Sequence, residues 1–222
     1  MKGPNMIKAA IFDVDGTLLD TMPFWATVGS RMIGRLGFEP VEQLDENILF
    51  MTLEESCAFI KKTYNLSESV TEIKEAVVKE VADYYLHEAK AKNGMPELLQ
   101  YFKENCIKMA IATAGDKRLV RAAFIRLGLD GYFEEIFTCS ELDLNKESAD
   151  IYLHAASALG SSPNETAVFE DILRAVRSAK SAGFITVAIE DSESECDREE
   201  IKLISDFYVS TREEILDIRE KL

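Results

Sequence analysis

The sequence predicts an α/β protein, a Rossmann-like parallel sheet flanked by helices and interrupted by an inserted all-α segment. From residue 94 onward, short apolar runs alternate with amphipathic stretches of roughly 10 to 15 residues, which is typical of successive βα units. One more apolar run, at 6–12, precedes this region. Between about residues 21 and 92 the periodicity is helical and no window favours a strand. These three observations define the fold class.

The expected strands are short and apolar along their whole length, which indicates burial on both faces of a parallel sheet. They are 6–12 (MIKAAIF), 107–113 (IKMAIAT), 134–139 (EEIFTC), 166–170 (TAVFE), 184–189 (FITVAI) and 206–209 (DFYV).

The segments between these strands carry apolar residues at i, i+3, i+4 and i+7, the pattern of a helix that packs one face on a sheet. They are 94–105, 116–128, 148–160 and 172–183. Three of the four end at glycine, a common helix stop. We expect Ser148 to cap the third helix, and the acidic segment 190–200 to be a solvated loop.

Charge and composition exclude several classes of partner. The chain has 222 residues, 25 Lys plus Arg against 40 Asp plus Glu, and a net charge of −15. Nucleic acids and anionic membranes bind clustered cations, so we expect neither as a partner. No apolar segment suggests a signal peptide or a membrane span, and we expect a cytoplasmic monomer or homodimer.

Polar residues follow the ends of four expected strands. In chain order they are Asp13 and Asp15, then Thr113 with Ala114, then Lys146, then Glu170 and Asp171. The carboxyl ends of parallel strands share one edge of the sheet, where ligands usually bind, so these residues are expected to converge.

Four carboxylates in one small volume require a counter-charge greater than Lys146 alone supplies. A divalent cation bound by oxygen ligands, together with one carboxyl group that stays protonated, would resolve the repulsion. Because neither His nor Cys accompanies these carboxylates, Mg²⁺ is the expected ion. The site would then attract a small phosphorylated metabolite despite the net negative charge of the chain.

These residues resemble the motifs of the haloacid dehalogenase-like hydrolase superfamily. FDVDGTLLDT at 12–21 is similar to the first motif, Thr113 to the second, Lys146 to the third and Glu170-Asp171 to the fourth. The likeness is to the members with a helical cap after the first motif, such as phosphoglycolate phosphatase and β-phosphoglucomutase. It implies an α/β catalytic core domain of residues 1–20 and 93–222, and a helical cap domain of residues 21–92.

The resemblance also implies a role for each residue in a Mg²⁺-dependent phosphatase. Asp13 would attack phosphorus and form an aspartyl-phosphate, while Asp15 would protonate the leaving oxygen and later deprotonate water. Thr113 and Lys146 would bind the substrate phosphoryl oxygens and hold Asp13 in position. The ligands of Mg²⁺ would be Asp13, Asp171 and Asp15 through its main-chain carbonyl, with Glu170 either a further ligand or a neighbour that supports the ligands. Beside this resemblance, the small residue Ala114 is expected to bind the substrate because it lets backbone N–H groups face an anion.

The sequence departs from the family pattern near these residues, so alternatives stay open. Lys146 lacks the two prolines that commonly follow it, and Ala114-Gly115 replaces a polar pair. In the insert, Trp25 and Phe50 either shape the substrate pocket or pack in a helical core. A phosphomutase of the β-phosphoglucomutase type and a non-catalytic phosphate-sensing protein are the competing functions.

Overall fold

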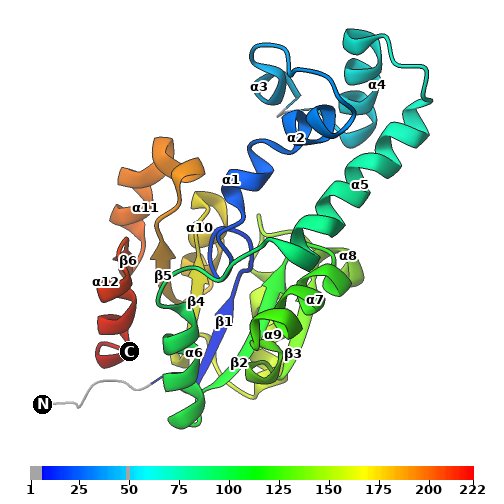
Figure 1. Cartoon of the computed structure of the whole chain (residues 1–222). Helices are drawn as coiled ribbons and strands as arrows, with labels where there is room; N and C mark the ends of the chain where they lie inside the picture. The colour runs from blue at the N-terminus through cyan, green and yellow to red at the C-terminus, as the bar shows by residue number, and fades with distance from the viewer. Residues whose placement is uncertain (1–6, 49–50) are drawn as a thin grey trace, which may run out of the picture. The chain divides into compact units, whose positions relative to one another are not determined.

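Six parallel strands form the central sheet in the computed structural model, which describes residues 7–48 and 51–222 (Figure 1). The strand order is β3-β2-β1-β4-β5-β6. The strands are β1 (Ala9–Phe12), β2 (Lys108–Thr113), β3 (Glu135–Thr138), β4 (Thr166–Glu170), β5 (Ile185–Ile189) and β6 (Phe207–Val209). Each lies inside the apolar run that predicted it, and the α/β class is confirmed.

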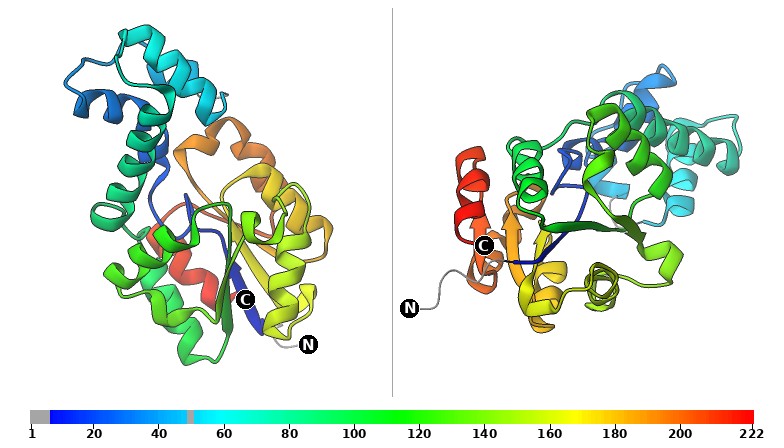
Figure 2. Two further views of the ribbon diagram at one scale, coloured as in Figure 1. Left: turned by 90° about the vertical axis from the view of Figure 1, so that its right-hand side faces the viewer. Right: turned by 90° about the horizontal axis from the view of Figure 1, so that it is seen from below.

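Helices cover both faces of this sheet (Figure 2). On one face, α9 (Asp150–Leu159) packs against β1, and α10 (Leu173–Ser181) packs against β4 and β5. Ala9 and Ile11 of β1 belong to the buried cluster on this face, together with Tyr152. On the other face, the ring of Phe12 lies 6.2 Å from that of Phe102 in α6 (Met95–Glu104). Side chains of β1 therefore alternate between two buried layers, as a strand covered on both sides requires.

The helices of the sheet-containing part are short. They are α6 (Met95–Glu104), α7 (Lys117–Leu127), α8 (Cys139–Leu142), α9 (Asp150–Leu159), α10 (Leu173–Ser181), α11 (Arg198–Ile204) and α12 (Arg212–Asp217). Four 3₁₀ turns accompany them in the described part of the chain, namely η1 (Asp130–Tyr132), η2 (Pro163–Glu165), η3 (Ser192–Asp197) and η4 (Ile218–Glu220).

Two details of the sequence prediction were wrong. The helix expected from Ser148 begins at Asp150, and Ala149 occupies the cap position. The hydroxyl of Ser148 instead donates to the carboxylate of Asp150 at 2.8 Å. The segment 190–200 is η3 and the start of α11, and its Asp191 is buried against Lys92 at 2.9 Å.

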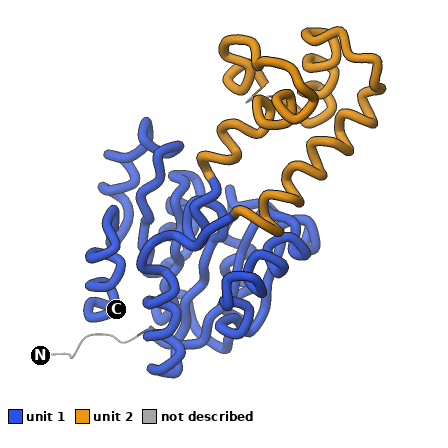
Figure 3. The backbone as a smooth tube through the Cα atoms, viewed as in Figure 1, with its two compact units in different colours: residues 1–21, 89–222 blue, residues 22–88 orange. Residues whose placement is uncertain are grey.

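The chain divides into two compact units (Figure 3). One comprises residues 1–21 and 89–222 and holds the sheet, and the other comprises residues 22–88. The helices of the second unit are α1 (Met22–Trp25), α2 (Val28–Arg35), α3 (Leu44–Ile48), α4 (Leu53–Tyr64) and α5 (Val70–His87). The boundaries expected from the sequence came after residues 20 and 92.

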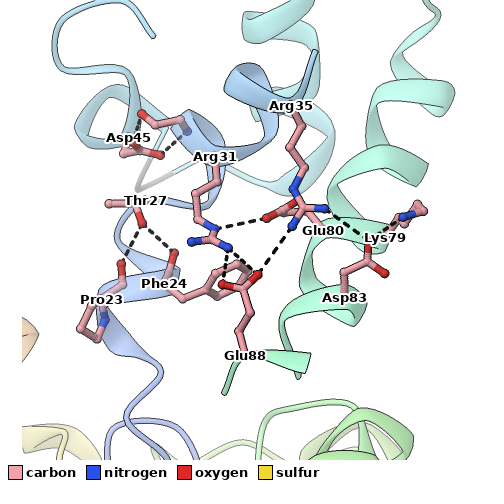
Figure 4. Close-up of polar contacts among 11 residues, drawn as sticks. Pro23, Phe24, Thr27, Arg31, Arg35, Asp45, Lys79, Glu80, Asp83 and Glu88 are labelled. Atoms are coloured by element: carbon pink, nitrogen blue, oxygen red, sulfur yellow. Dashed lines mark hydrogen bonds and ion pairs between the residues drawn. The ribbon is translucent and has the colours of Figure 1, made fainter. Parts of the chain in front are cut away.

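A buried carboxylate joins two helices inside the second unit (Figure 4). Glu80 of α5 is only 2% exposed and accepts from Arg31 of α2 at 3.2 Å, and Arg35 pairs with its other oxygen. Arg31 also holds Glu88 through both carboxylate oxygens, at 2.8 and 2.9 Å. Paired charges of this kind fix α2 against α5 beside an apolar core of Ile33, Ile60 and neighbouring residues.

In the described part of the chain, no helix is both long and apolar enough to cross a membrane.

Candidate active site

The carboxylates of Asp13 and Glu170 lie at the carboxyl ends of two adjacent strands, β1 and β4. Phe12 at the end of β1 is in register with Phe169 of β4, and the amide of Asp13 donates to the carbonyl of Phe169 at 3.0 Å. Asp13 and Glu170 therefore leave neighbouring strands at the same level, with Asp171 next in the chain. This point lies between β1 and β4, where the strand order reverses and ligands of open α/β sheets bind.

Lys146 reaches this pair from the loop before α9. Its ammonium group pairs with Asp13 Oδ1 and donates to Glu170 Oε1 at 2.7 Å, and its side chain is 9% exposed. The main-chain carbonyl of Lys146 accepts from Ser178 of α10 at 3.0 Å. Asn145 accepts from the amides of Glu147 and Ser148, so side-chain hydrogen bonds hold the loop that lacks prolines.

The carboxylates fit a metal ion. One oxygen from each of Asp13, Glu170 and Asp171 lies within 4.8 Å of the others. Glu170 Oε2 and Asp171 Oδ2 are buried and have no hydrogen-bond partner, an arrangement that is costly unless a ligand satisfies them. The other Asp171 oxygen accepts from Thr17 at 3.3 Å. These hard, acceptor-only oxygens suit Mg²⁺.

Burial and mutual repulsion shift the ionisation of this cluster. Burial raises the pKa of Asp13 to about 7 even though Lys146 opposes the change. Burial, with repulsion from Asp13 and Glu170, also raises the pKa of Asp171 well above its ordinary value. Burial alone would lower the pKa of Lys146, but attraction to the two carboxylates holds it above its usual range. The ammonium is therefore permanent, while the carboxylates lack sufficient counter-charge.

Asp15 and Thr113 both lie close to Gly115 in the loop after β2. Thr21 donates to Asp15 Oδ1 at 2.6 Å and fixes that half-buried carboxylate. A Cβ atom at Gly115 would lie 3.5 Å from Asp15 Oδ2 and 3.3 Å from the hydroxyl of Thr113. The amide of Gly115 donates to that hydroxyl at 3.0 Å. A small residue here keeps the space between the aspartate and the threonine open.

Three other residues were predicted to contact the substrate, namely Ala114, Trp25 and Phe50. Ala114 is exposed in the loop after β2. Trp25 belongs to the second unit, where it is 37% exposed and its ring packs edge-on against Phe24 and Tyr85. Phe50 lies outside the described residues. Their contact with a substrate stays a prediction.

Sequence reasoning missed three residues that support the site. They are Thr21 on Asp15, Ser178 on the Lys146 loop, and Tyr152, whose hydroxyl donates to Glu170 Oε1 at 2.6 Å. Tyr152 falls on the apolar face of a predicted helix, and a buried tyrosine hydroxyl normally needs a partner. That rule signals a hydrogen bond but does not name its acceptor.

The amino-acid sequence matches a known protein family and several named phosphatases. The family model of the haloacid dehalogenase-like hydrolases matches residues 10–189. A phosphorylated carbohydrates phosphatase of Thermotoga maritima is 29% identical over 177 residues, which cover 80% of this chain and 82% of that protein. The N-acetylmuramic acid 6-phosphate phosphatase of Pseudomonas aeruginosa is 26% identical over 187 residues, covering 82% and 81% of the two chains.

Solved structures show the same fold. A Thermotoga maritima protein provisionally named a β-phosphoglucomutase has a TM-score of 0.86 and 26% identity, covering 97% of this chain and all of that one. The family match spans both the Asp13 loop and the Glu170-Asp171 pair. From its fold, its motifs and this match, the chain belongs to the haloacid dehalogenase-like hydrolase family.

Proposed function

We propose that this protein is a Mg²⁺-dependent phosphatase that hydrolyses the phosphomonoester of a small metabolite, most simply a phosphorylated sugar, through an aspartyl-phosphate on Asp13. The observation that carries the proposal is the buried cluster in which Asp13 meets Lys146 while Glu170 and Asp171 each keep one oxygen unpaired. Two relatives named as phosphatases of phosphorylated sugars or sugar derivatives support the substrate class.

Asp13 is the proposed nucleophile. One of its carboxylate oxygens forms a bond to phosphorus as the bond between phosphorus and the ester oxygen breaks. Water then attacks phosphorus, the bond to Asp13 breaks, and inorganic phosphate leaves with the carboxylate restored. Lys146, bound to Asp13 Oδ1, limits rotation of the carboxylate before attack.

Asp15 is the proposed general acid and base. It gives its proton to the departing alkoxide in the first step and takes a proton from water in the second. The 2.6 Å hydrogen bond from Thr21 keeps the carboxylate oriented.

Lys146, Thr113 and Ala114 are the proposed contacts of the phosphoryl oxygens. Asp13, Glu170, Asp171 and the main-chain carbonyl of Asp15 are the proposed ligands of Mg²⁺. When bound, the cation would offset the negative charge of the phosphoryl group and of the carboxylate that attacks it. Lys146 has a raised pKa and therefore contributes a permanent positive charge to the same oxygens.

We assign the remaining specificity to the inserted unit. Residues 22–88 lie in the sequence between β1 and β2, directly after the loop that carries Asp13 and Asp15. As a cap domain this unit would select the substrate, with Trp25 and Phe50 as the proposed contacts.

A phosphomutase is the second candidate because the solved structure with a TM-score of 0.86 carries that provisional name. The two functions differ in the fate of the phosphoryl group. A phosphatase releases it to water without an added bisphosphate, whereas a mutase returns it to a sugar.

The test is phosphate release from a panel of phosphorylated sugars, with Mg²⁺ or with EDTA and without a bisphosphate. We expect turnover by wild type with Mg²⁺ only, and none by Asp13→Asn. Turnover that persists in Asp13→Asn would disprove the mechanism. A wild-type protein that binds Mg²⁺ and phosphate but releases none from any sugar would contradict the phosphatase. Isomerisation of a sugar phosphate after a bisphosphate is added would then indicate a phosphomutase, and no reaction would indicate a phosphate-sensing protein.

A further inference from the structure

The hydroxyl of Tyr152 touches the proposed metal site from inside the core. Tyr152 lies on α9, is 0% exposed, and packs its ring edge-on against Phe184 at 6.3 Å. Its hydroxyl donates to Glu170 Oε1 at 2.6 Å, the short distance typical of a hydroxyl that donates to a charged oxygen.

Two donors meet at a single oxygen of Glu170. Lys146 binds the same Oε1 at 2.7 Å, while Oε2 is buried and has no partner. The backbone of Glu170 is fixed, because this residue ends β4 and pairs with Ala188 of β5. Rotating the carboxylate out of this orientation would break both hydrogen bonds at Oε1. Tyr152 and Lys146 together therefore leave Oε2 as the oxygen available to a ligand.

The chemical type of the second donor matters as much as its position. Asp13, Glu170 and Asp171 carry three negative charges when ionised, and Lys146 supplies one positive charge. A second ammonium at the position of Tyr152 would reduce the remaining charge that attracts a cation. A phenol hydroxyl orients Glu170 without adding charge, so it does not weaken the attraction of the cluster for a divalent ion.

We propose that Tyr152 is a positioning residue that holds Glu170 so that Oε2 binds the divalent cation. This inference rests on the proposed function, because it assumes that Glu170 is a ligand of Mg²⁺. Partners that orient metal ligands typically contribute about 10- to 100-fold in metal affinity. We expect an effect near the lower limit, because Lys146 still restrains Oε1 when the hydroxyl is removed.

The experiment titrates full-length protein with Mg²⁺ alone and measures the dissociation constant by calorimetry. We expect Tyr152→Phe to bind Mg²⁺ about tenfold more weakly than wild type. The matched control is Tyr132→Phe, which also deletes one hydroxyl hydrogen bond, at 2.8 Å to Gln100 on the surface. This control should bind Mg²⁺ as wild type does.

A double-mutant cycle separates positioning from a general loss of structure. In a Glu170→Gln background, adding Tyr152→Phe should weaken Mg²⁺ binding no further, because the carboxylate that the hydroxyl orients is already absent. An equal loss in both backgrounds would overturn the proposal, as would unchanged affinity in the single variant Tyr152→Phe. Wild-type protein that binds no Mg²⁺ would contradict the proposed function itself, a failure distinct from either of these.

Discussion

The cost of keeping Asp13 buried and ionised predicts an unusual dependence of stability on pH. Burial raises the pKa of this carboxyl from 3.8 to about 7 in the protein without metal. Between these two values the native state holds a proton that the unfolded state has lost. The free energy of unfolding therefore falls as pH rises through this window, and the fall ends above about pH 7.

The expected magnitude follows from the part of this window that lies between pH 5 and pH 8. About two pH units of the window fall in this range, from pH 5 to about pH 7. At about 1.4 kcal/mol per pH unit, the free energy of unfolding of wild type falls by about 3 kcal/mol. The variant Asp13→Asn carries a neutral side chain of the same shape at every pH. It should therefore lack this loss, and its advantage over wild type should grow by about 3 kcal/mol from pH 5 to pH 8.

The assay is urea unfolding of both proteins in EDTA at a series of pH values. The matched control is Asp206→Asn. Partial burial opposes the shift at Asp206, but hydrogen bonds from Lys180 and Thr186 hold its pKa below the ordinary value. That carboxyl stays ionised from pH 5 to pH 8, so Asp206→Asn should show the wild-type slope. If the free energy of unfolding changed with pH equally in Asp13→Asn and wild type, Asp13 would not hold a proton in the native state over this range.

Three further predictions concern catalysis, folding and metal binding. Thr21→Val removes the 2.6 Å hydrogen bond to Asp15 and should lower kcat about tenfold with little change in KM, since such a bond contributes about 1.5 kcal/mol. Glu80→Leu removes the buried carboxylate that pairs with Arg31 and Arg35, which keep Glu88 as a partner, and should lower the free energy of unfolding by about 2 kcal/mol in urea titrations. Mg²⁺ at a hundredfold excess over its dissociation constant should stabilise wild type by about 2.7 kcal/mol in thermal melts, but not Asp171→Asn.

Each of these predictions has a result that contradicts it. Unchanged kcat in Thr21→Val would mean that Asp15 needs no support from the hydroxyl. The control for Glu80 is Lys79→Ala, which breaks an exposed pair with Asp83 and should cost at most about 1 kcal/mol. An equal loss of unfolding free energy in the two variants would show that burial of Glu80 does not increase the contribution of its ion pairs to stability. Stabilisation of Asp171→Asn by Mg²⁺ equal to that of wild type would remove Asp171 from the ligands.

Most of the sheet could be predicted because its strands are buried on both faces. Burial of this kind requires continuous apolar runs, which a single sequence displays directly, as in AAIF of β1 and ITVAI of β5. Helix starts in the inserted unit carry equally local signals, for example Ser69 with Glu72 at the beginning of α5. Both signals depend on neighbours in the chain and not on the tertiary fold.

What could not be predicted depends on partners far away in the sequence. Ser178 lies in an amphipathic helix, yet its hydroxyl donates to the main-chain carbonyl of Lys146, 32 residues earlier. Asp191 looks like part of a solvated loop, yet Lys92, almost one hundred residues earlier, pairs with it in the interior. In the helical pattern of the sequence, Tyr152 counts as an apolar residue. The acceptor of its hydroxyl, Glu170, is identified only in the folded structure.

The central claim is that Asp13 receives the phosphoryl group of the substrate. A single-turnover reaction with a hydrolysed sugar phosphate, quenched in acid and mapped by peptide mass spectrometry, tests it most directly. We expect a Mg²⁺-dependent phosphoryl adduct on Asp13 of wild type, and no adduct anywhere in Asp13→Asn. Complete hydrolysis by wild type with an adduct on another residue, or a full adduct in EDTA, would contradict it.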